Sequence, residues 1–346
     1  MSAKLDILSD NLPEATQTFL VTHRYAMLYH LPEWLRIVAA LTSSELFYLV
    51  LSDGETGHTK GIVPLCLKNG AFGAIANSSP FFGSHGGILA ADDESFQGLA
   101  RALHAFLIER RVMLMNVIEP LFECSKNQYE RTLPVSAMDH RIGQFKDLSP
   151  ISDRDTLLGS VGGLTRSNLN RKAWRSGMKI YRDESPAALE SLYTMHVQEM
   201  GAKPGGNPKP RSFFEHIAHL RQGAVSYRLY LGEIDGEVVA GLLLLLWREY
   251  VEYITPVFKD HARACQPLSA LVFQAMLDAA VEGYRWWNFG GTWREQEGLM
   301  KFKESWGAQS KLYQYYILDL GGLEAFKGCD REVLKKEYYG FYLYPF

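Results

Sequence analysis

Short runs of alternating or continuous apolar residues recur along the chain, and such runs are typical of β-strands. The clearest runs form two pairs, each separated by an Asp-Gly dipeptide: residues 46–51 with 61–67 around Asp53-Gly54, and 227–232 with 237–247 around Asp235-Gly236. Asp-Gly between two apolar runs is a strong signal for a tight turn between antiparallel strands. Each pair therefore predicts a β-hairpin.

The same order of elements follows each hairpin. The first is followed by a strand at 71–77, a helix near 94–110 and a strand at 112–117; the second by a strand at 250–257, a helix near 267–282 and a strand at 285–289. A helical stretch precedes each hairpin, at 32–41 and 186–200. This repetition predicts an α/β (α+β) duplication, in which each half is a mixed, mostly antiparallel sheet flanked by helices.

The length of 346 residues suits two domains. Residues 149–163 are rich in Ser, Asp and Gly, and we place the boundary there, with domains at 1–150 and 151–320. Closing strands are predicted at 142–148 and 312–318. The tail, 321–346, ends in a run of aromatic residues, and we expect it to dock on one of the two lobes because such a run makes an unusual exposed patch.

Composition excludes several classes of protein. Apolar residues make up 47% and charged residues 22%, and 36 basic residues against 39 acidic ones leave a net charge of -3. No overall field attracts a polyanion, so we expect no DNA binding. The longest apolar stretch, 238–247, is too short to span a bilayer, and no secretion signal is evident. The four cysteines lie far apart and predict reduced thiols in a cytoplasmic protein: Cys66, Cys124, Cys265 and Cys329.

Common hydrolase and metal signatures are missing. The chain contains no GxSxG, HExxH or phosphate-binding P-loop motif. His216 and His219 lie three residues apart on a predicted helix, but a solvated helix face explains this spacing and no acidic or cysteine partner is nearby in the sequence. We therefore expect no metal.

A strongly basic run covers residues 164–182, which contain six Lys and Arg and no acidic residue. Arg171, Arg175 and Lys179 recur at intervals of four, which predicts one side of a helix weakened at Gly177. A solvated helix face and contact with a phosphate-bearing substrate both remain open for this run.

The densest cluster of chemistry-bearing residues is 288–307, NFGGTWREQEGLMKFKESWG. A predicted strand ends at Gly290-Gly291, where backbone can approach a ligand closely. Lys303 follows in the next helix. A lysine in this place stabilises an oxyanion or holds a phosphate, or it merely caps a helix or pairs with Glu304.

The second half resembles a known family in its motifs. A helix containing His196, the hairpin at Asp235-Gly236, G-Y-x-x-x-N-F-G-G at 283–291 and F-K-x-x-W-G at 302–307 are similar to the peptidoglycan-bridge aminoacyltransferases of the FemA/FemB type and to FemAB-like, GNAT-type acyltransferases. The resemblance implies two tandem GNAT-like lobes. It also implies transfer of an acyl or aminoacyl group from an activated donor to an amine, for example of a cell-envelope or polysaccharide precursor.

The resemblance also implies site residues. Lys303 matches the family lysine placed near the reacting carbonyl and phosphate groups. Tyr253, and His196 or Glu297, are candidates for handling protons or for orienting the reacting groups. The other residues that we expect to contact substrate are Arg166, Arg171, His196, Arg211, Gly290, Trp293 and Arg294. Transfer of this kind needs a polarised carbonyl and a neutral attacking amine.

Two kinds of donor are compatible with the sequence. No cofactor is expected to stay bound, and the donor is either aminoacyl-tRNA, which would make tRNA a partner, or acyl-CoA. A loop that binds the pyrophosphate of acyl-CoA needs close backbone approach, but residues 258–268 contain no glycine. The alternatives are an acyl-CoA-dependent N-acyltransferase with an unusual loop, and a non-catalytic binding protein that retains the fold.

Overall fold

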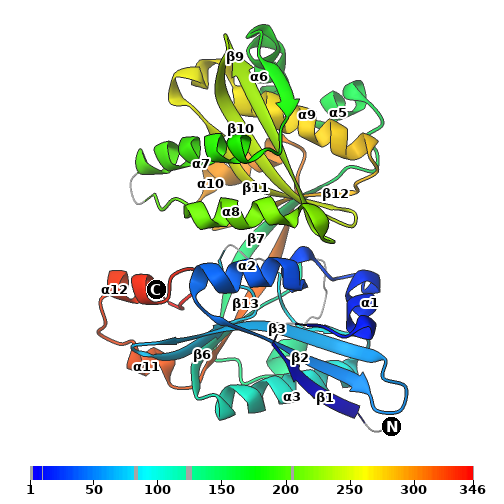
Figure 1. The fold of residues 1–346 in the computed structure, drawn as a ribbon, viewed down its shortest axis with the longest axis vertical. Helices are drawn as coiled ribbons and strands as arrows, with labels where there is room; N and C mark the ends of the chain where they lie inside the picture. The colour runs from blue at the N-terminus through cyan, green and yellow to red at the C-terminus, as the bar shows by residue number, and fades with distance from the viewer. Residues whose placement is uncertain (1–2, 10, 82–84, 122–126, 204–205, 346) are drawn as a thin grey trace. The chain divides into compact units, whose positions relative to one another are not determined.

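The structure is a computed structural model that describes the chain except for residues 1–2, 10, 82–84, 122–126, 204–205 and 346. Contacts between residues divide the chain into two compact units (Figure 1). Unit 1 comprises Met1–Arg141 and Leu312–Phe346, and unit 2 comprises Ile142–Lys311.

Unit 1 is built on a sheet with the strand order β1-β2-β3-β4-β6-β13. Only β4 and β6 are parallel neighbours along this path; the other pairs are antiparallel. The short strand β5 pairs with β3. The bounds are β1 Ala3–Leu8, β2 Glu45–Asp53, β3 Thr59–Gly70, β4 Gly73–Asn77, β5 Leu89–Ala90, β6 Val112–Ile118 and β13 Gln309–Asp319.

Unit 2 repeats this plan with the strand order β7-β12-β11-β10-β9-β8. Again one pair of neighbours, β11 and β12, is parallel and the others are antiparallel. The bounds are β7 Ala137–Asp147, β8 Lys179–Arg182, β9 Ser226–Ile234, β10 Glu237–Trp247, β11 Tyr250–Phe258 and β12 Trp286–Thr292. The sequence β2-β3-β4-α3-β6 in unit 1 corresponds to β9-β10-β11-α9-β12 in unit 2.

The predicted hairpins are present. The β9–β10 turn consists of Asp235 and Gly236, both with positive φ (51° and 82°), which is the geometry of a two-residue turn between twisted strands. The β2–β3 turn is longer, and the Asp53 carboxylate accepts the backbone N–H groups of Glu55 and Thr56 at 3.0 Å each. The predicted fold class, two mixed sheets flanked by helices, is confirmed.

Helices cover both faces of the sheet in each unit. In unit 1, α2 and α3 lie on opposite faces (Figure 1). The helices of unit 1 are α1 Glu14–Thr22, α2 Pro32–Thr42, α3 Asp93–Glu109, α4 Gln128–Thr132, α11 Gly322–Ala325, α12 Arg331–Glu337 and the 3-10 helix η1 Leu28–His30. Helix α3 begins where the Asp92 carboxylate accepts the Ser95 N–H at 2.8 Å, and its apolar face, including Leu99 and Leu103, packs on the sheet.

The helices of unit 2 are α5 Arg154–Ser160, α6 Gly163–Arg171, α7 Pro186–Gly201, α8 Arg211–Ala218, α9 Pro267–Val281, α10 Glu297–Ser305 and the 3-10 helices η2 Ala173–Arg175, η3 His219–Gln222 and η4 Asp260–Cys265. Helix α9 begins at Pro267, whose missing N–H costs nothing in a first turn. Its side chains pack against β10, β11 and β12 in a core that includes Trp287 and Trp306.

The predicted helix through Arg171, Arg175 and Lys179 is wrong. Helix α6 ends at Arg171, a single 3-10 turn follows, and Lys179 opens strand β8. Gly177, at φ +72°, makes the bend, and pairing of β8 with β9 satisfies the backbone groups that a continued helix would have used. The three cations therefore do not share one helix face.

Each sheet ends with a strand that follows the other repeat in the sequence. Residues 142–147 of β7 pair with β12 in unit 2, although β7 follows the first repeat in the sequence. Residues 315–319 of β13 pair with β6 in unit 1, although β13 follows the second repeat. The two units therefore exchange their closing strands.

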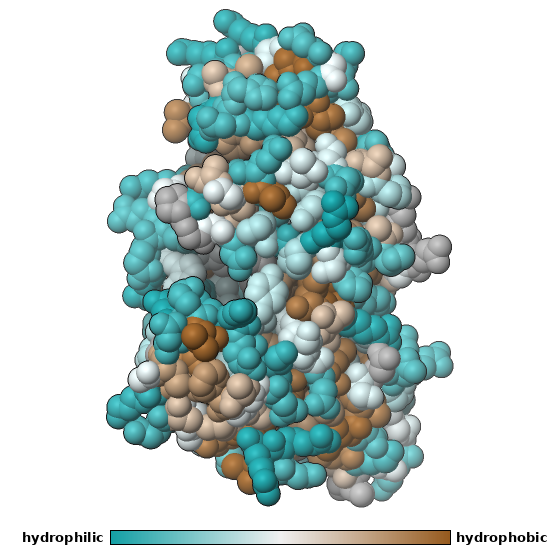
Figure 2. All heavy atoms as spheres, turned by 60° about the vertical axis from the view of Figure 1, so that its left-hand side comes forward, coloured by the Kyte–Doolittle hydropathy of each residue, from teal (hydrophilic) through white to brown (hydrophobic). Residues whose placement is uncertain are grey.

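The aromatic tail packs on the unit 1 sheet. Phe326, Tyr338 and Leu343 join a buried cluster with Ile75 of β4 and Leu114 of β6. Hydrogen bonds also hold the tail, since the Tyr338 hydroxyl donates to the Gly73 carbonyl at 2.8 Å. On the face in Figure 2, hydrophilic residues predominate and hydrophobic ones form small separate groups.

Candidate active site

The parallel strands β11 and β12 pair only at their beginnings. Their register joins Tyr250 to Trp286, Val251 to Trp287 and Glu252 to Asn288. Both strands are fully described and continue beyond this point, to Phe258 and to Thr292, without further pairing between them. In unit 1, by contrast, β4 and β6 stay paired up to Asn77, the last residue of β4. The diverging ends of β11 and β12 are therefore a local feature of unit 2.

Lys303 of helix α10 reaches the end of β12. Its side chain is buried, with 3% of the residue exposed. The Nζ atom donates to the Gly290 carbonyl at 3.2 Å, the Gly291 carbonyl at 3.4 Å and the Thr292 hydroxyl at 2.6 Å. Burial lowers the pKa of Lys303 to about 8, so the ammonium form still predominates at neutral pH. The three oxygens compensate in part for the water that the ammonium has lost.

Gln144 of β7 supports this arrangement from the other side. The Thr292 hydroxyl donates to Gln144 Oε1 at 3.3 Å, and Gln144 Nε2 donates to the Met300 carbonyl of α10 at 3.2 Å and to Ser310 Oγ at 3.3 Å. Gln144 is fully buried. It therefore ties together β7, the end of β12 and the helix that carries Lys303.

Gly290 adopts a conformation that only glycine enters at low cost. Its φ is +74°, and the strand register of β12 against β7 is irregular between Asn288 and Gly291. The Asn288 side-chain Oδ1 accepts the Gly290 N–H at 2.9 Å. This turn directs the carbonyl groups of Gly290 and Gly291 toward the Lys303 ammonium.

Two of the candidates for proton handling, Tyr253 and Glu297, lie in different surroundings. The Tyr253 ring packs against Phe289 and Trp287, with centroids 5.2 and 6.2 Å away, and burial raises its pKa far above the usual value. Tyr253 therefore stays a protonated phenol at neutral pH and can donate a hydrogen bond. Glu297 opens helix α10, is exposed and pairs with Lys301 at 3.3 Å.

Trp293 and Arg294 follow β12 directly. Trp293 is 43% exposed, and Arg294 is also exposed. The structure therefore brings Gly290 and Lys303 into contact and places Trp293 and Arg294 at the surface next to the same strand end.

His196 and Arg211 are engaged elsewhere in unit 2. His196 is buried on α7, and its Nε2 accepts the backbone N–H of Lys209 at 2.9 Å. Burial, with the positive charges of Lys209 and Lys203, lowers the pKa of His196 to about 4. Arg211 is exposed, donates to both carboxylate oxygens of Glu190 at 2.8 Å and stacks over Tyr193. His196 is thus neutral, and its acceptor nitrogen is already used by the backbone.

The start of helix α6 contacts the end of α10. The Gly162 N–H donates to the Ser305 carbonyl at 2.7 Å, and Thr165 and Ser305 join their hydroxyls at 2.7 Å. Arg166 donates to the Gly159 and Val161 carbonyls. Arg171, Lys172 and Arg175 are exposed and take part in no ion pair with the described residues.

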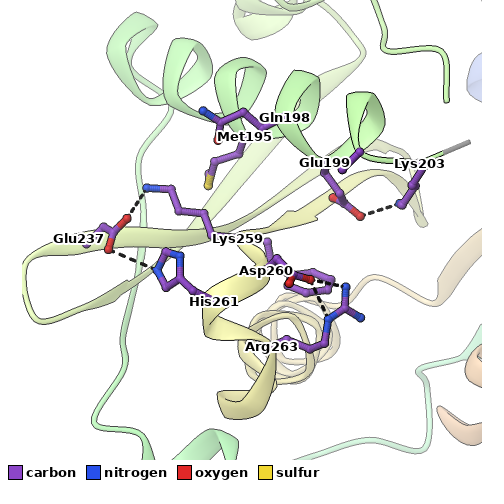
Figure 3. Close-up of a pocket in the computed structure, with 11 residues that line it drawn as sticks. Met195, Gln198, Glu199, Lys203, Glu237, Lys259, Asp260, His261 and Arg263 are labelled. Atoms are coloured by element: carbon purple, nitrogen blue, oxygen red, sulfur yellow. Dashed lines mark hydrogen bonds and ion pairs between the residues drawn. The ribbon is translucent and has the colours of Figure 1, made fainter.

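A pocket of about 740 Å³ lies in unit 2, bounded by the end of α7, the start of β10, the end of β11 and η4 (Figure 3). Its charged side chains pair with one another: Lys203 with Glu199 at 2.7 Å, Lys259 and His261 with Glu237 at 2.7 and 3.4 Å, and Arg263 with Asp260 at 2.7 Å. The volume suits a small ligand or part of a larger one. None of the predicted site residues is among those that Figure 3 draws.

Within the described ranges, no group of three or more His, Cys, Asp and Glu side chains is placed to hold a metal ion. Cys66, Cys265 and Cys329 are free, and Cys124 lies outside the described residues. No helix in the described part of the chain is long and apolar enough to cross a membrane.

Comparisons with known proteins agree with the fold. Residues 165–304 match the family model of the acetyltransferase (GNAT) domain, and no curated protein is significantly similar in sequence. The solved structure of FemX superposes with a TM-score of 0.70 at 16% identity, over 93% of this chain and 99% of that one. A tandem GNAT protein from the clavulanic acid biosynthesis pathway superposes with a TM-score of 0.58 at 13% identity, over 92% of this chain and 99% of that one. L-PGS from Bacillus licheniformis superposes with a TM-score of 0.54 at 15% identity, over 89% of this chain and 92% of that one.

The match over residues 165–304 and the fold together support an acyltransferase of the GNAT class. Residues 165–304 match the GNAT domain model, and the chain as a whole has the fold seen in FemX and in the tandem GNAT protein. The resemblance expected from the NFGG and FK motifs is confirmed.

Sequence reasoning missed four buried partners of the site: Gln144, Glu252, Asn288 and Thr292. One signal was available for Glu252, a charged residue inside the apolar strand YVEYITPV. Asn288 and Thr292 flank the two glycines of the quoted motif. Gln144 gave no signal, because its partners lie more than 140 residues away in the chain.

Proposed function

We propose that this protein transfers an activated aminoacyl or acyl group to an amine of a cell-envelope precursor, with Lys303 supplying positive charge beside the reacting carbonyl. The observation that carries the proposal is the buried Lys303 ammonium at the point where β11 and β12 have diverged. A fixed positive charge in a site with little water stabilises the oxyanion that forms when an amine attacks a carbonyl. The exposed Trp293 and Arg294 beside the same strand end are proposed to contact substrate.

Proton transfer follows from the state of the candidate groups. Tyr253 stays protonated, so we assign it donation of a proton or hydrogen bond to the leaving group. Glu297 is an exposed carboxylate and is proposed to accept a proton from the attacking ammonium, directly or through water. His196 is excluded as a base because its acceptor nitrogen already receives the Lys209 N–H. We assign His196 and Arg211 to shaping the substrate-binding region.

Aminoacyl-tRNA is the favoured donor. Three exposed cations without a described ion-pair partner, Arg171, Lys172 and Arg175, extend from α6, whose first turn contacts the end of α10 at Ser305. We assign these three residues and Arg166 to contacts with the phosphates of the donor. The proposed reaction would take place in the cytoplasm, where such donors are made.

The match to an acetyltransferase domain favours a second candidate, an acyl-CoA-dependent N-acyltransferase. Against it, the chain after β11 forms the 3-10 helix η4 with no glycine, and Lys259 and Arg263 there already pair with Glu237 and Asp260. A pyrophosphate would have to displace those carboxylates. The pocket at the end of β11 nevertheless offers a place for a small acyl chain.

A transfer assay separates the two candidates. The full chain is incubated with radiolabelled alanyl-tRNA or acetyl-CoA and with a nucleotide-linked sugar peptide that carries a free lysine amine. We expect label on the acceptor from alanyl-tRNA. Transfer from acetyl-CoA alone would replace the first candidate by the second. Each donor is also tested by thermal melting; a ligand present at 100 times its Kd stabilises the folded chain by about 2.7 kcal/mol. If neither donor transfers label or raises the melting temperature, the enzymatic proposal is wrong.

A further inference from the structure

A buried carboxylate lies at the last paired position of β11 and β12. Glu252 and Asn288 are each 1% exposed, and they are register partners on the two parallel strands. The Asn288 Nδ2 donates to Glu252 Oε2 at 2.8 Å. Burying a carboxylate is costly, so the residue type at position 252 calls for an explanation beyond strand packing.

The Asn288 side chain connects this carboxylate to the Lys303 site. Its Nδ2 faces Glu252, while its Oδ1 accepts the Gly290 N–H at 2.9 Å. Gly290 in turn presents its carbonyl to Lys303 Nζ at 3.2 Å. The hydrogen bonds therefore run without a gap from Glu252 through Asn288 and the Gly290 turn to the Lys303 ammonium.

A carboxyl group at position 252 fixes the orientation of the Asn288 amide in a way that a neutral amide or hydroxyl would not. The Glu252 carboxyl oxygen accepts from the NH2 of Asn288, and an ionised carboxylate would have no proton to offer the Asn288 carbonyl oxygen. That leaves the Asn288 Oδ1 pointing at Gly290. An amide or hydroxyl at position 252 could both donate and accept, and would then allow Asn288 to turn over and release the Gly290 N–H.

Unit 1 shows that the fold itself does not need the charge. The last register partners of the parallel pair in unit 1 are Asn77 and Asn116, whose side-chain amides lie 2.9 Å apart. Asn116 also donates to the Tyr342 carbonyl of the tail at 2.7 Å. A neutral pair thus suffices at this position in the GNAT-like sheet of unit 1. The carboxylate occurs in the unit that carries Lys303.

We propose that Glu252 is a positioning residue, whose carboxylate orients Asn288 and thereby holds the Gly290 turn that presents its carbonyl groups to Lys303. Its effect on catalysis rests on the proposed function, but its effect on the position of Lys303 does not. The two can therefore be tested separately.

The test exchanges the two partners. Asn288→Asp alone places two carboxylates against each other, whereas Glu252→Gln combined with Asn288→Asp restores one hydrogen bond with donor and acceptor exchanged. An aspartate at position 288 can still accept the Gly290 N–H. Glu252→Gln alone keeps an acceptor but no longer fixes the orientation of Asn288.

The readout is the rate at which acetic anhydride acetylates Lys303, followed by peptide mass spectrometry at pH 8. We expect Asn288→Asp to raise this rate by about 10-fold or more and the double variant to return it to within about 3-fold of the original, because coupled neighbours give non-additive effects. Glu252→Gln should lie between them. Lys301, exposed on the same helix, controls for the reagent.

Lys146 distinguishes a local change from general unfolding. It is also buried in unit 2, where its Nζ donates to Ser160 Oγ at 2.8 Å, and burial lowers its pKa to about 8 as well. We expect the Lys146 rate to stay constant in the three variants. Parallel increases at Lys146 and Lys303, or no rescue in the double variant, would overturn the proposal.

Kinetics then separate this inference from the proposed function. In the alanyl-tRNA assay, Asn288→Asp should lower kcat and leave KM for the donor unchanged, with recovery in the double variant. If the acetylation pattern is found and no transfer occurs with any donor, the proposed function fails and the positioning role stands. If transfer occurs and the acetylation pattern is absent, the positioning role fails alone.

Discussion

The Lys303 ammonium and the Thr292 hydroxyl are 2.6 Å apart, the shortest of the three hydrogen bonds that Lys303 makes to the end of β12. The lysine of the FK motif is therefore held by the strand that it follows, not by a carboxylate. A salt bridge to Glu304, the structural alternative for this residue, is not formed in the described residues. The positive charge stays unneutralised at the strand end, as an electrostatic role requires.

Replacing Lys303 by Met is expected to lower transfer by about 100-fold or more, the loss typical of removing one electrostatic stabiliser. Met keeps most of the apolar side chain, so the melting temperature should change little by comparison. Initial rates and thermal melts of the variant measure both effects. Lys301→Met is the matched control on the exposed face of α10 and should keep its activity. A loss of melting temperature that accounts for the lost activity would make Lys303 structural.

Stability should increase as pH rises from about 8 to about 10. The pKa of Lys303 is about 8 in the folded chain and about 10.4 in an unfolded one, so the unfolded chain binds more protons in that window. Between pH 8 and 10, a buried lysine with this lowered pKa raises the free energy of unfolding by up to about 1.4 kcal/mol per pH unit. Below pH 8 it adds nothing to the slope. Urea unfolding at several pH values measures the slope. Lys303→Met should reduce it, and an unchanged slope would contradict the lowered pKa.

Acid should destabilise the chain in part through His196. Its pKa is about 4 in the folded chain and about 6.5 when unfolded, so stability falls as pH drops from 6.5 to 4. In His196→Gln, the side-chain oxygen can still accept the Lys209 N–H, and the fall between pH 6.5 and 5 should become shallower. His58→Gln, at an exposed position, serves as the control. Equal slopes in both variants would show that His196 titrates normally.

The Gly290 turn predicts opposite effects for two Gly→Ala changes. A Cβ on Gly290 would meet no atom within 4 Å, so its cost comes from the φ of +74° and should be about 1 kcal/mol or more. Gly298 also has open space around its Cβ position but lies inside α10, so Gly298→Ala should stabilise by about 0.5–1 kcal/mol. Denaturant unfolding compares the two. A stabilising Gly290→Ala would show that the turn is not maintained in solution.

The basic residues of α6 and η2 predict how donor binding depends on salt. If the donor is aminoacyl-tRNA, affinity should fall with salt by a logarithmic slope of roughly 0.7 for each phosphate neutralised on a single strand. Arg171→Glu with Arg175→Glu should flatten that slope in a filter-binding titration. Arg101→Glu with Arg131→Glu, exposed in unit 1, is the matched control. Tight acetyl-CoA binding that ignores the reversal at 171 and 175 would favour the acyl-CoA candidate.

The sequence by itself determined the elements whose causes are local. The Asp235-Gly236 turn follows from two residues that accept positive φ, and α3 and α9 lie within one residue of their predicted ranges because apolar periodicity and start signals act within a few turns. The repeated order of these elements was enough to predict two mixed sheets. The FK motif also pointed to Lys303, although its catalytic role, like that of the other site residues, stays a prediction.

Tertiary structure decided what depends on contacts between distant residues. Nothing near β7 or β13 in the sequence shows that they close each other's sheets, because strand partners are chosen by burial and by free edges across the whole fold. The same holds for Lys303. Its three oxygens come from the end of β12, the Gly290 turn is held by Asn288, and Asn288 is oriented by Glu252 on β11. The residue types showed that 288–307 is rich in groups suited to catalysis. Only the folded sheet places the Glu252 carboxyl group and the Lys303 ammonium at opposite ends of one series of hydrogen bonds.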